Sequence, residues 1–187
     1  MNGEKILLIS FSARQNGNCD DIIEFLGNQC TDLQIDTMNI CDLSFVGCTD
    51  CNYQCMNDRC LYHDDDIYSF LDDTKEYKKV VYIVPMYCGF PSSFYFALNE
   101  RSQDYWMQNE KYYNDFTKKL YIIGIGNDNN NLLFQKIFEE NFLSNDILGH
   151  VMILKTHEYK LSSINDRLIN LDIVKKDILK FVLGTQK

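Results

Sequence analysis

The sequence predicts a three-layer α/β sandwich, in which a five-stranded parallel sheet carries helices on both faces. Short apolar runs alternate along the chain with segments of helical periodicity, and such alternation is typical of strands joined by helical crossovers. These runs are residues 6–9, 33–40, 79–85, 120–125 and 150–155. Runs 6–9, 79–85 and 120–125 are apolar at consecutive positions, which indicates strands buried on both faces. Run 33–40 alternates between apolar and polar residues, which indicates an edge strand.

The helical segments complete this pattern. We expect helices at about residues 18–29, 64–73, 132–143 and 165–183, and one that begins after a cap at Ser92 or Ser93. Asp64, Asp65 and Asp66 suit the positive end of the second helix. At 187 residues the chain is most simply one domain, residues 1–187, with a cysteine-rich insertion at about 41–63.

Composition excludes some classes of partner. The 27 acidic residues outnumber the 18 basic ones, giving a net charge of −9, which argues against nucleic acid or an anionic membrane as a partner. No segment reaches the roughly 20 apolar residues that span a bilayer, and the apolar run at 6–11 is too short for a signal peptide. We therefore expect a cytoplasmic protein, whose eight cysteines are thiols, metal ligands or redox centres.

The loop after the first strand is a candidate anion site. Ser12, Arg14, Gly17 and Asn18 bring hydroxyl, guanidinium and backbone N–H donors to the start of a helix. Free N–H groups at a helix start bind phosphate without a basic protein surface. The alternative is an ordinary strand-to-helix turn with an asparagine cap. The loop has neither the G-x-G-x-x-G pattern nor the Lys-Ser/Thr pair of a P-loop.

The segment from Ser12 to Cys19, SARQNGNC, resembles the phosphate loop of the flavodoxin-like NAD(P)H-dependent FMN reductases, Ser-Pro-Arg-x-x-Gly-Asn-Ser/Thr. Ala13 and Cys19 depart from that pattern. Pro85-Met86-Tyr87-Cys88-Gly89 is similar to the family's Pro-x-Tyr-x-Gly segment, and Gly124-Ile125-Gly126-Asn127 matches a glycine-bearing loop in place. At the family's later Lys, Asp and Arg positions the chain has Phe96, Glu100 and Arg101, so only the arginine is kept.

This resemblance implies a flavodoxin-like sheet of order 2-1-3-4-5 and bound FMN, with NAD(P)H as co-substrate. It also implies which residues bind the cofactor. Those around the phosphate are Ser10, Ser12, Arg14, Gly17, Asn18 and Cys19, and those beside the flavin ring are Pro85, Met86, Tyr87, Cys88, Gly89, Gly124, Gly126 and Asn127. The flavin performs the electron chemistry, so no catalytic acid–base pair is expected.

A cysteine motif, Cys48-x2-Cys51-x3-Cys55-x4-Cys60, lies in the insertion. Iron–sulfur flavoproteins of the same superfamily carry a similar Cys-x2-Cys-x2-Cys-x4-7-Cys motif after the second strand. The interpretations are a [4Fe–4S] cluster, a tetrahedral zinc ion, or unliganded and redox-active thiols. His63 is a further candidate ligand, although a loop residue is the simpler interpretation; Cys30 and Cys41 are expected to be small apolar fillers.

Three functions follow from these patterns. The first is an FMN-dependent oxidoreductase that transfers hydride from NAD(P)H to a small acceptor such as a quinone, a flavin or a metal ion. The second is an electron carrier, of flavodoxin or iron–sulfur flavoprotein type, that acts with a redox protein partner. The third is a cofactor-free binding module. The resemblance also implies a homodimer or homotetramer, for which an aromatic set could form the contact surface or simply pack within the chain: Phe94, Tyr95, Tyr105, Trp106, Tyr112 and Tyr113.

Overall fold

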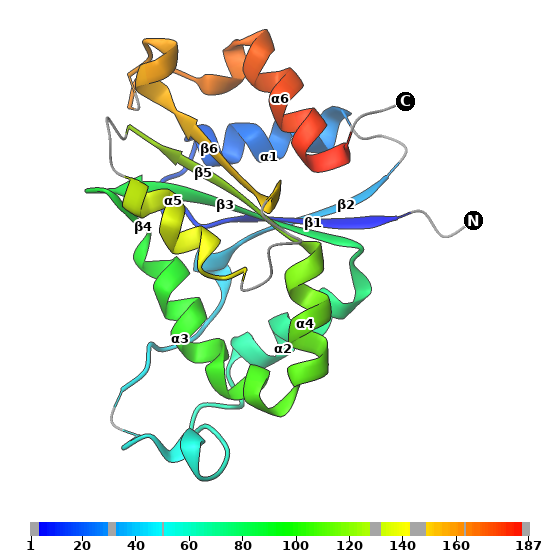
Figure 1. Ribbon diagram of the computed structural model, residues 1–187, viewed down its shortest axis with the longest axis vertical. Helices are drawn as coiled ribbons and strands as arrows, with labels where there is room; N and C mark the ends of the chain where they lie inside the picture. The colour runs from blue at the N-terminus through cyan, green and yellow to red at the C-terminus, as the bar shows by residue number, and fades with distance from the viewer. Residues whose placement is uncertain are drawn as a thin grey trace.

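The computed structural model describes residues 4–29, 33–49, 51–127, 132–142, 149–162 and 164–184. Its parallel sheet lies between two layers of helices (Figure 1). The strands are β1 (Lys5–Ser10), β2 (Gln34–Asn39), β3 (Lys79–Tyr87), β4 (Phe90–Pro91), β5 (Leu120–Gly126) and β6 (Val151–Lys155). The helices are α1 (Asn18–Gln29), α2 (Asp66–Asp73), α3 (Ser93–Gln108), α4 (Glu110–Lys119), α5 (Leu132–Glu139) and α6 (Asp172–Leu183).

The sheet order is β2-β1-β3-β5-β6, and every pair along this path is parallel. The predicted α/β class, with helices on both faces of a parallel sheet, is confirmed. The order matches the expected one once β4 is set aside. That strand was not predicted, because it has two residues and pairs antiparallel with the end of β3.

Two apolar cores lie on opposite faces of the sheet. On one face, α1 and α6 pack on β1, β3 and β5 through Ile22, Val174 and Ile178. On the other face, α2, α3, α4 and α5 cover the sheet with a core rich in aromatic rings (Figure 1). Strand β3 has five consecutive buried residues from Val80 to Val84, as expected of a central strand covered by both layers.

Several boundaries differ from the prediction. The segment after Ser92 forms two helices, because α3 ends at Gln108 and α4 begins at Glu110. The last helix begins at Asp172 instead of residue 165, since a 3₁₀ turn at Leu168–Asn170 precedes it. Ser92 occupies the cap position of α3, but its buried hydroxyl makes no capping bond and has no partner among the described residues.

Candidate functional site

The three loops singled out from the sequence follow adjacent strands, so they share one edge of the sheet. Strands β1, β3 and β5 are neighbours and run parallel, which places their carboxyl ends together. The second and third loops are in direct contact there, because a Cβ atom on Gly126 would lie 2.6 Å from the Cβ of Met86. Gly126 therefore has no room for a side chain. In open α/β sheets this edge is where ligands bind.

The first loop is shaped by its own hydroxyl groups. The Ser12 hydroxyl accepts a hydrogen bond from the Arg14 N–H at 3.1 Å and donates to the Arg14 carbonyl at 3.2 Å. The Ser10 hydroxyl accepts one from the Ser12 N–H at 3.3 Å. Asn16 has a φ of 54°, a left-handed conformation that asparagine tolerates. The serine hydroxyls thus stabilise the turn.

The Arg14 and Asn18 side chains bind a distant segment of the chain. An Arg14 guanidinium nitrogen donates to the Ile164 carbonyl at 2.8 Å. The Asn18 amide accepts from the Leu168 N–H at 2.8 Å and donates to the Asp166 carbonyl at 3.3 Å. Both side chains therefore hold the connection between β6 and α6 over the start of α1. Sequence reasoning missed this role, because the partners lie about 150 residues away.

The Cys19 side chain points into the core and away from the predicted phosphate site. It is 4% exposed and packs within the α1 face of the sheet. Burial, with the nearby Asp20 and Asp21 carboxylates, raises the pKa of the Cys19 thiol to about 12. Its sulfur is therefore a neutral packing group, so any contribution of Cys19 to anion binding comes from its backbone N–H.

What remains for an anion is a set of backbone N–H groups at the start of α1. Within this turn the Gly17 N–H donates to the Asp20 carboxylate at 3.5 Å, and the Asp21 N–H donates to the Gly17 carbonyl at 3.0 Å. The N–H groups of Asn18, Cys19 and Asp20 have no partner among the described residues. They lie at the positive end of a 12-residue helix, a position that favours a negatively charged ligand.

The second loop is a tight hairpin that exposes two aromatic rings. Cys88 and Gly89 form a two-residue turn between β3 and β4, with φ values of 51° and 85°, as a primed turn requires. Tyr87 and Phe90 face each other across this hairpin and are 51% and 47% exposed. Tyr87 was predicted as an aromatic wall. Phe90 was missed, because strand β4, which places it opposite Tyr87, has only two residues and was not predicted.

In the third loop, Gly124 and Gly126 have different roles. A Cβ atom on Gly124 would lie 2.7 Å from Ile153 Cδ1 and 2.8 Å from Phe134 Cε1. Gly124 is therefore a packing position inside the sheet, and Gly126 and the exposed Asn127 lie nearer the edge. Asp128 and the three asparagines after it, at 129–131, lie outside the described residues.

The cysteine motif does not form a metal site in the described part of the chain. Among those residues, no three His, Cys, Asp or Glu side chains converge as metal ligands. All seven described cysteines are free thiols; Cys30 lies outside the described residues. The structure thus gives no support for the iron–sulfur or zinc interpretation. His63 contacts the Cys60 carbonyl at 2.8 Å.

The four motif cysteines instead line one cavity of about 520 Å³. It lies between the cysteine segment and α3 and includes Cys48, Cys51, Cys55 and Cys60. Burial, followed by the Cys51, Asp104 and Cys60 charges, raises the pKa of the Cys55 thiol. Burial also raises the pKa of the Cys48 thiol, with the Arg101 charge acting in the opposite direction.

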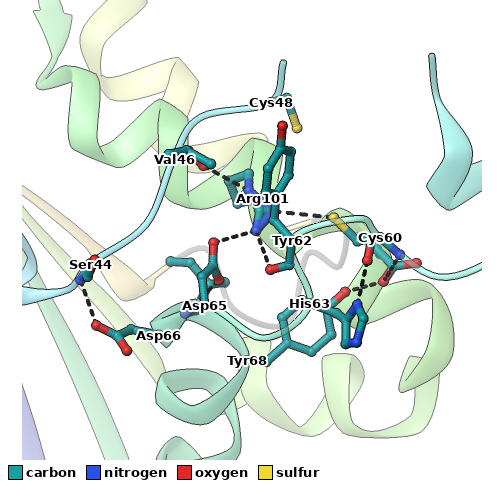
Figure 2. Close-up of polar contacts among 12 residues, drawn as sticks. Ser44, Val46, Cys48, Cys60, Tyr62, His63, Asp65, Asp66, Tyr68 and Arg101 are labelled. Atoms are coloured by element: carbon teal, nitrogen blue, oxygen red, sulfur yellow. Dashed lines mark hydrogen bonds and ion pairs between the residues drawn. The ribbon is translucent and has the colours of Figure 1, made fainter. Parts of the chain in front are cut away.

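Arg101 joins this cysteine segment to α3 (Figure 2). Its guanidinium is buried and donates to the Val46 carbonyl at 2.8 Å, to the Tyr62 carbonyl at 2.9 Å and to the Asp65 carboxylate at 2.5 Å. A fourth contact, at 3.4 Å, reaches the sulfur of Cys60. Arg101 was noted in the sequence as a retained family position, but none of these partners was predicted.

Asp104 is the second buried charge at this junction. Its carboxylate accepts hydrogen bonds from the Cys60 N–H at 3.1 Å, from the Gln108 amide at 3.0 Å and from the Tyr68 hydroxyl. Burial and this last bond raise the pKa of Tyr68. Cys60 is therefore fixed from both sides, by Arg101 at its sulfur and by Asp104 at its backbone.

The predicted aromatic set packs mainly within the chain. Tyr95 and Tyr105 are buried, and Phe94, Trp106, Tyr112 and Tyr113 are half-buried. The Trp106 ring contacts the rings of Tyr105 and Phe116, each with centroids 5.0 Å apart. Packing within the chain, one of the two interpretations left open, is therefore what the structure shows for these rings.

The fold defines a class, the flavodoxin-like α/β proteins, and comparison with solved structures confirms the expected likeness to FMN reductases at the level of fold. An FMN-dependent NADH-azoreductase from Bacillus anthracis str. Ames Ancestor superposes with a TM-score of 0.59, at 13% identity over 97% of this chain and 100% of that one. The flavoenzyme NAD(P)H:(acceptor) oxidoreductase FerB from Paracoccus denitrificans gives a TM-score of 0.55, at 14% identity over 97% and 96%.

A third structure, a flavone reductase, superposes with a TM-score of 0.57 and 13% identity, and covers 96% of this chain. The chain spans 60% of the length of that reductase. No protein-family model matches the sequence, and no curated protein matches it either. Within the described residues, no helix is both long and apolar enough to cross a membrane.

Proposed function

We propose that this protein is an FMN-dependent oxidoreductase that passes hydride from NAD(P)H through the flavin to a small acceptor. The carrying observation is the row of N–H groups at Asn18, Cys19 and Asp20 that have no partner in the described part of the chain. They lie at the same sheet edge as the exposed Tyr87 and Phe90 rings. A polar cradle beside an aromatic surface suits a ligand with a phosphate at one end and a flat ring at the other.

The residues present fit FMN in this position. The N–H groups of α1 would hold the phosphate through local partial charges, which explains how a protein of net charge −9 accepts an anion. The Pro85–Gly89 backbone and the Tyr87 and Phe90 rings would border the flavin, with Gly126 at the end of the neighbouring strand β5 and Asn127 directly after it. When bound, FMN supplies the hydride chemistry. The chain's own groups bind and orient it, and no acid–base pair is needed.

The motif implied that Arg14 and Asn18 contact the phosphate, but in this proposal they act by positioning the phosphate loop. They tie the connection before α6 to the phosphate loop, and so keep the N–H groups of α1 in place. Replacing both by alanine weakens FMN binding by loosening the loop, whether or not either side chain touches the phosphate.

Aromatic truncation tests the proposal directly. Purified protein is titrated with FMN, and binding is followed by quenching of flavin fluorescence. We expect the Tyr87→Ala/Phe90→Ala double variant to bind FMN about tenfold more weakly, because stacking partners are lost. Tyr53→Ala is the matched control, since Tyr53 is 78% exposed on the cysteine segment. Equal affinity in all three proteins contradicts the assigned ring site. If the wild-type protein does not bind flavin, the proposed function is overturned, and the cofactor-free binding module is the interpretation that remains.

A second candidate, an electron carrier, is favoured by one observation. The net charge of −9 suits docking to a basic redox partner. Rapid mixing of the flavin-loaded protein with NADH or NADPH separates the two functions. Direct bleaching of the flavin supports the oxidoreductase, whereas bleaching only with a reduced protein partner supports the carrier. Homodimer or homotetramer assembly and a cytoplasmic location remain predictions that accompany either function.

A further inference from the structure

The cavity of four thiols has no role in the proposed flavin chemistry. It lies against the Glu100–Asp104 stretch of α3, whereas the candidate flavin edge is formed by the loops that follow β1, β3 and β5. Its volume of about 520 Å³ is large enough for a small organic ligand. Four of the seven described cysteines line it, without forming a disulfide or a metal site among the described residues.

Cys60 differs from the other cysteines in having a fixed cation at its sulfur. Arg101 donates to Cys60 Sγ at 3.4 Å, and three of its other N–H donors are held by two carbonyls and by Asp65. The guanidinium therefore cannot swing away, and it is positioned to stabilise negative charge on this sulfur during attack. Cys60 is 7% exposed and lies on the cavity wall, whereas Cys41 and Cys88 are exposed, but no cation contacts the sulfur of Cys41 or Cys88 among the described residues.

The charges around the cavity favour some ligands over others. Glu100 and Asp104 contribute two carboxylates to its wall, while the positive charge of Arg101 is matched by Asp65 at 2.5 Å. The wall is therefore acidic overall, which opposes an anionic ligand. Tyr53 and Tyr62 add aromatic surface for an uncharged or cationic one.

We propose that this cavity is a thiol–disulfide exchange site, which takes a small uncharged or cationic organic disulfide and uses Cys60 as the attacking thiol. The Cys60 sulfur bonds to one sulfur of the ligand, whose S–S bond breaks and whose other half leaves as a thiol with the proton. A second cavity thiol, Cys51 or Cys55, then attacks the Cys60 sulfur and releases the remaining half as a thiol. The two cysteines are oxidised by two electrons, and the ligand disulfide is reduced to two thiols.

The test compares sites within one protein. Fully reduced protein is treated in separate reactions with 2-hydroxyethyl disulfide, cystamine and glutathione disulfide, then alkylated and mapped by peptide mass spectrometry over time. With the first two reagents we expect Cys60 to react about tenfold faster than Cys41 or Cys88, since one charge-assisted hydrogen bond favours it. An internal disulfide from Cys60 to Cys51 or Cys55 should then accumulate. The anionic glutathione disulfide should react more slowly at Cys60.

Two variants sharpen this test. Cys60→Ser should abolish the internal disulfide, whereas Cys41→Ser should retain it. If Cys60→Ser does not fold, as judged by circular dichroism, the comparison of sites in the wild-type protein decides alone. Reaction of Cys41 and Cys88 as fast as Cys60 overturns the proposal, and fastest reaction with glutathione disulfide overturns the choice of ligand charge. Flavin binding is measured separately and does not enter either outcome.

Discussion

At the scale of single residues, the buried charge of Arg101 lies where the cysteine segment meets α3. Arg101 is 1% exposed and has four partners on the cysteine segment and the start of α2. A buried guanidinium is tolerated only when its donors are all satisfied. Arg101 therefore has a structural role in this chain: it holds the cysteine segment against α3.

The first prediction concerns this residue. Arg101→Met should lower the free energy of unfolding by about 3–5 kcal/mol, because it leaves the Asp65 carboxylate uncompensated in a partly buried site. Urea unfolding followed by circular dichroism measures the change. Lys118→Met is the control, since its pair with Asp115 is 3.9 Å long and exposed, and it should cost nothing measurable. Equal losses in both variants contradict the assignment.

At the scale of elements, the start of α1 depends on a segment from the far end of the chain. The connection before α6 contacts this helix through Asn18, and Arg167 adds an ion pair to Asp21 at 3.3 Å. The helix that would bind phosphate is thus positioned by the last crossover of the fold. Arg14 and Asn18 belong to a motif that we interpreted as phosphate contacts. In this structure their side chains join the start of α1 to the connection before α6.

Asn18→Ala should therefore destabilise the protein even without flavin. The Leu168 N–H is buried and would lose its acceptor, which costs about 1–3 kcal/mol. Urea unfolding measures the loss, and hydrogen exchange should show faster exchange at the Leu168 amide. Gln15→Ala, at an exposed position of the same loop, serves as the control. Unchanged stability with Leu168 still protected would show that this contact is not needed.

At the scale of the whole molecule, several tyrosine hydroxyls are held in their neutral form. Burial raises the pKa of Tyr82; burial with a hydrogen bond to Asp72 raises that of Tyr105. Burial also raises the pKa of Tyr95 to about 12, and burial with a hydrogen bond to Asp36 raises that of Tyr77 to about 12. These residues lie in or beside the aromatic core on one face of the sheet.

The sign of their effect on stability follows from linkage. A pKa that is higher in the folded than in the unfolded protein gives stability that is complete below the unfolded value, about 10. That stability is lost as the pH rises toward 12 and beyond. We therefore expect cooperative alkaline unfolding, with tyrosinate absorbance near 295 nm rising in the same transition. Tyr82→Phe should move this transition to higher pH. Gradual ionisation of all tyrosines near pH 10, without unfolding, contradicts the prediction.

The sequence by itself determined the parallel sheet and the presence of helices on both of its faces. It did not separate α3 from α4, and the ligand-binding edge that it indicated stays a prediction. Consecutive apolar positions in residues 79–85 and alternation in residues 33–40 distinguished central from edge strands, because burial on one or two faces leaves a local pattern. The polar turns after three strands followed from the same local signals. The residues inferred as a cofactor site therefore fall on one edge, although which of them touch a flavin stays a prediction.

Only the tertiary structure decided what the individual side chains do. Asn18 is paired with a residue 150 positions away, and Arg101 with partners 36 to 55 positions away. The spacing of the cysteines left an iron–sulfur cluster, a zinc ion and unliganded thiols open, and the fold places these cysteines on one cavity with no metal-ligand cluster among the described residues. Local patterns record burial and turn geometry. Contacts between distant segments depend on how the crossovers fold back onto the sheet, and no short stretch of sequence contains that information.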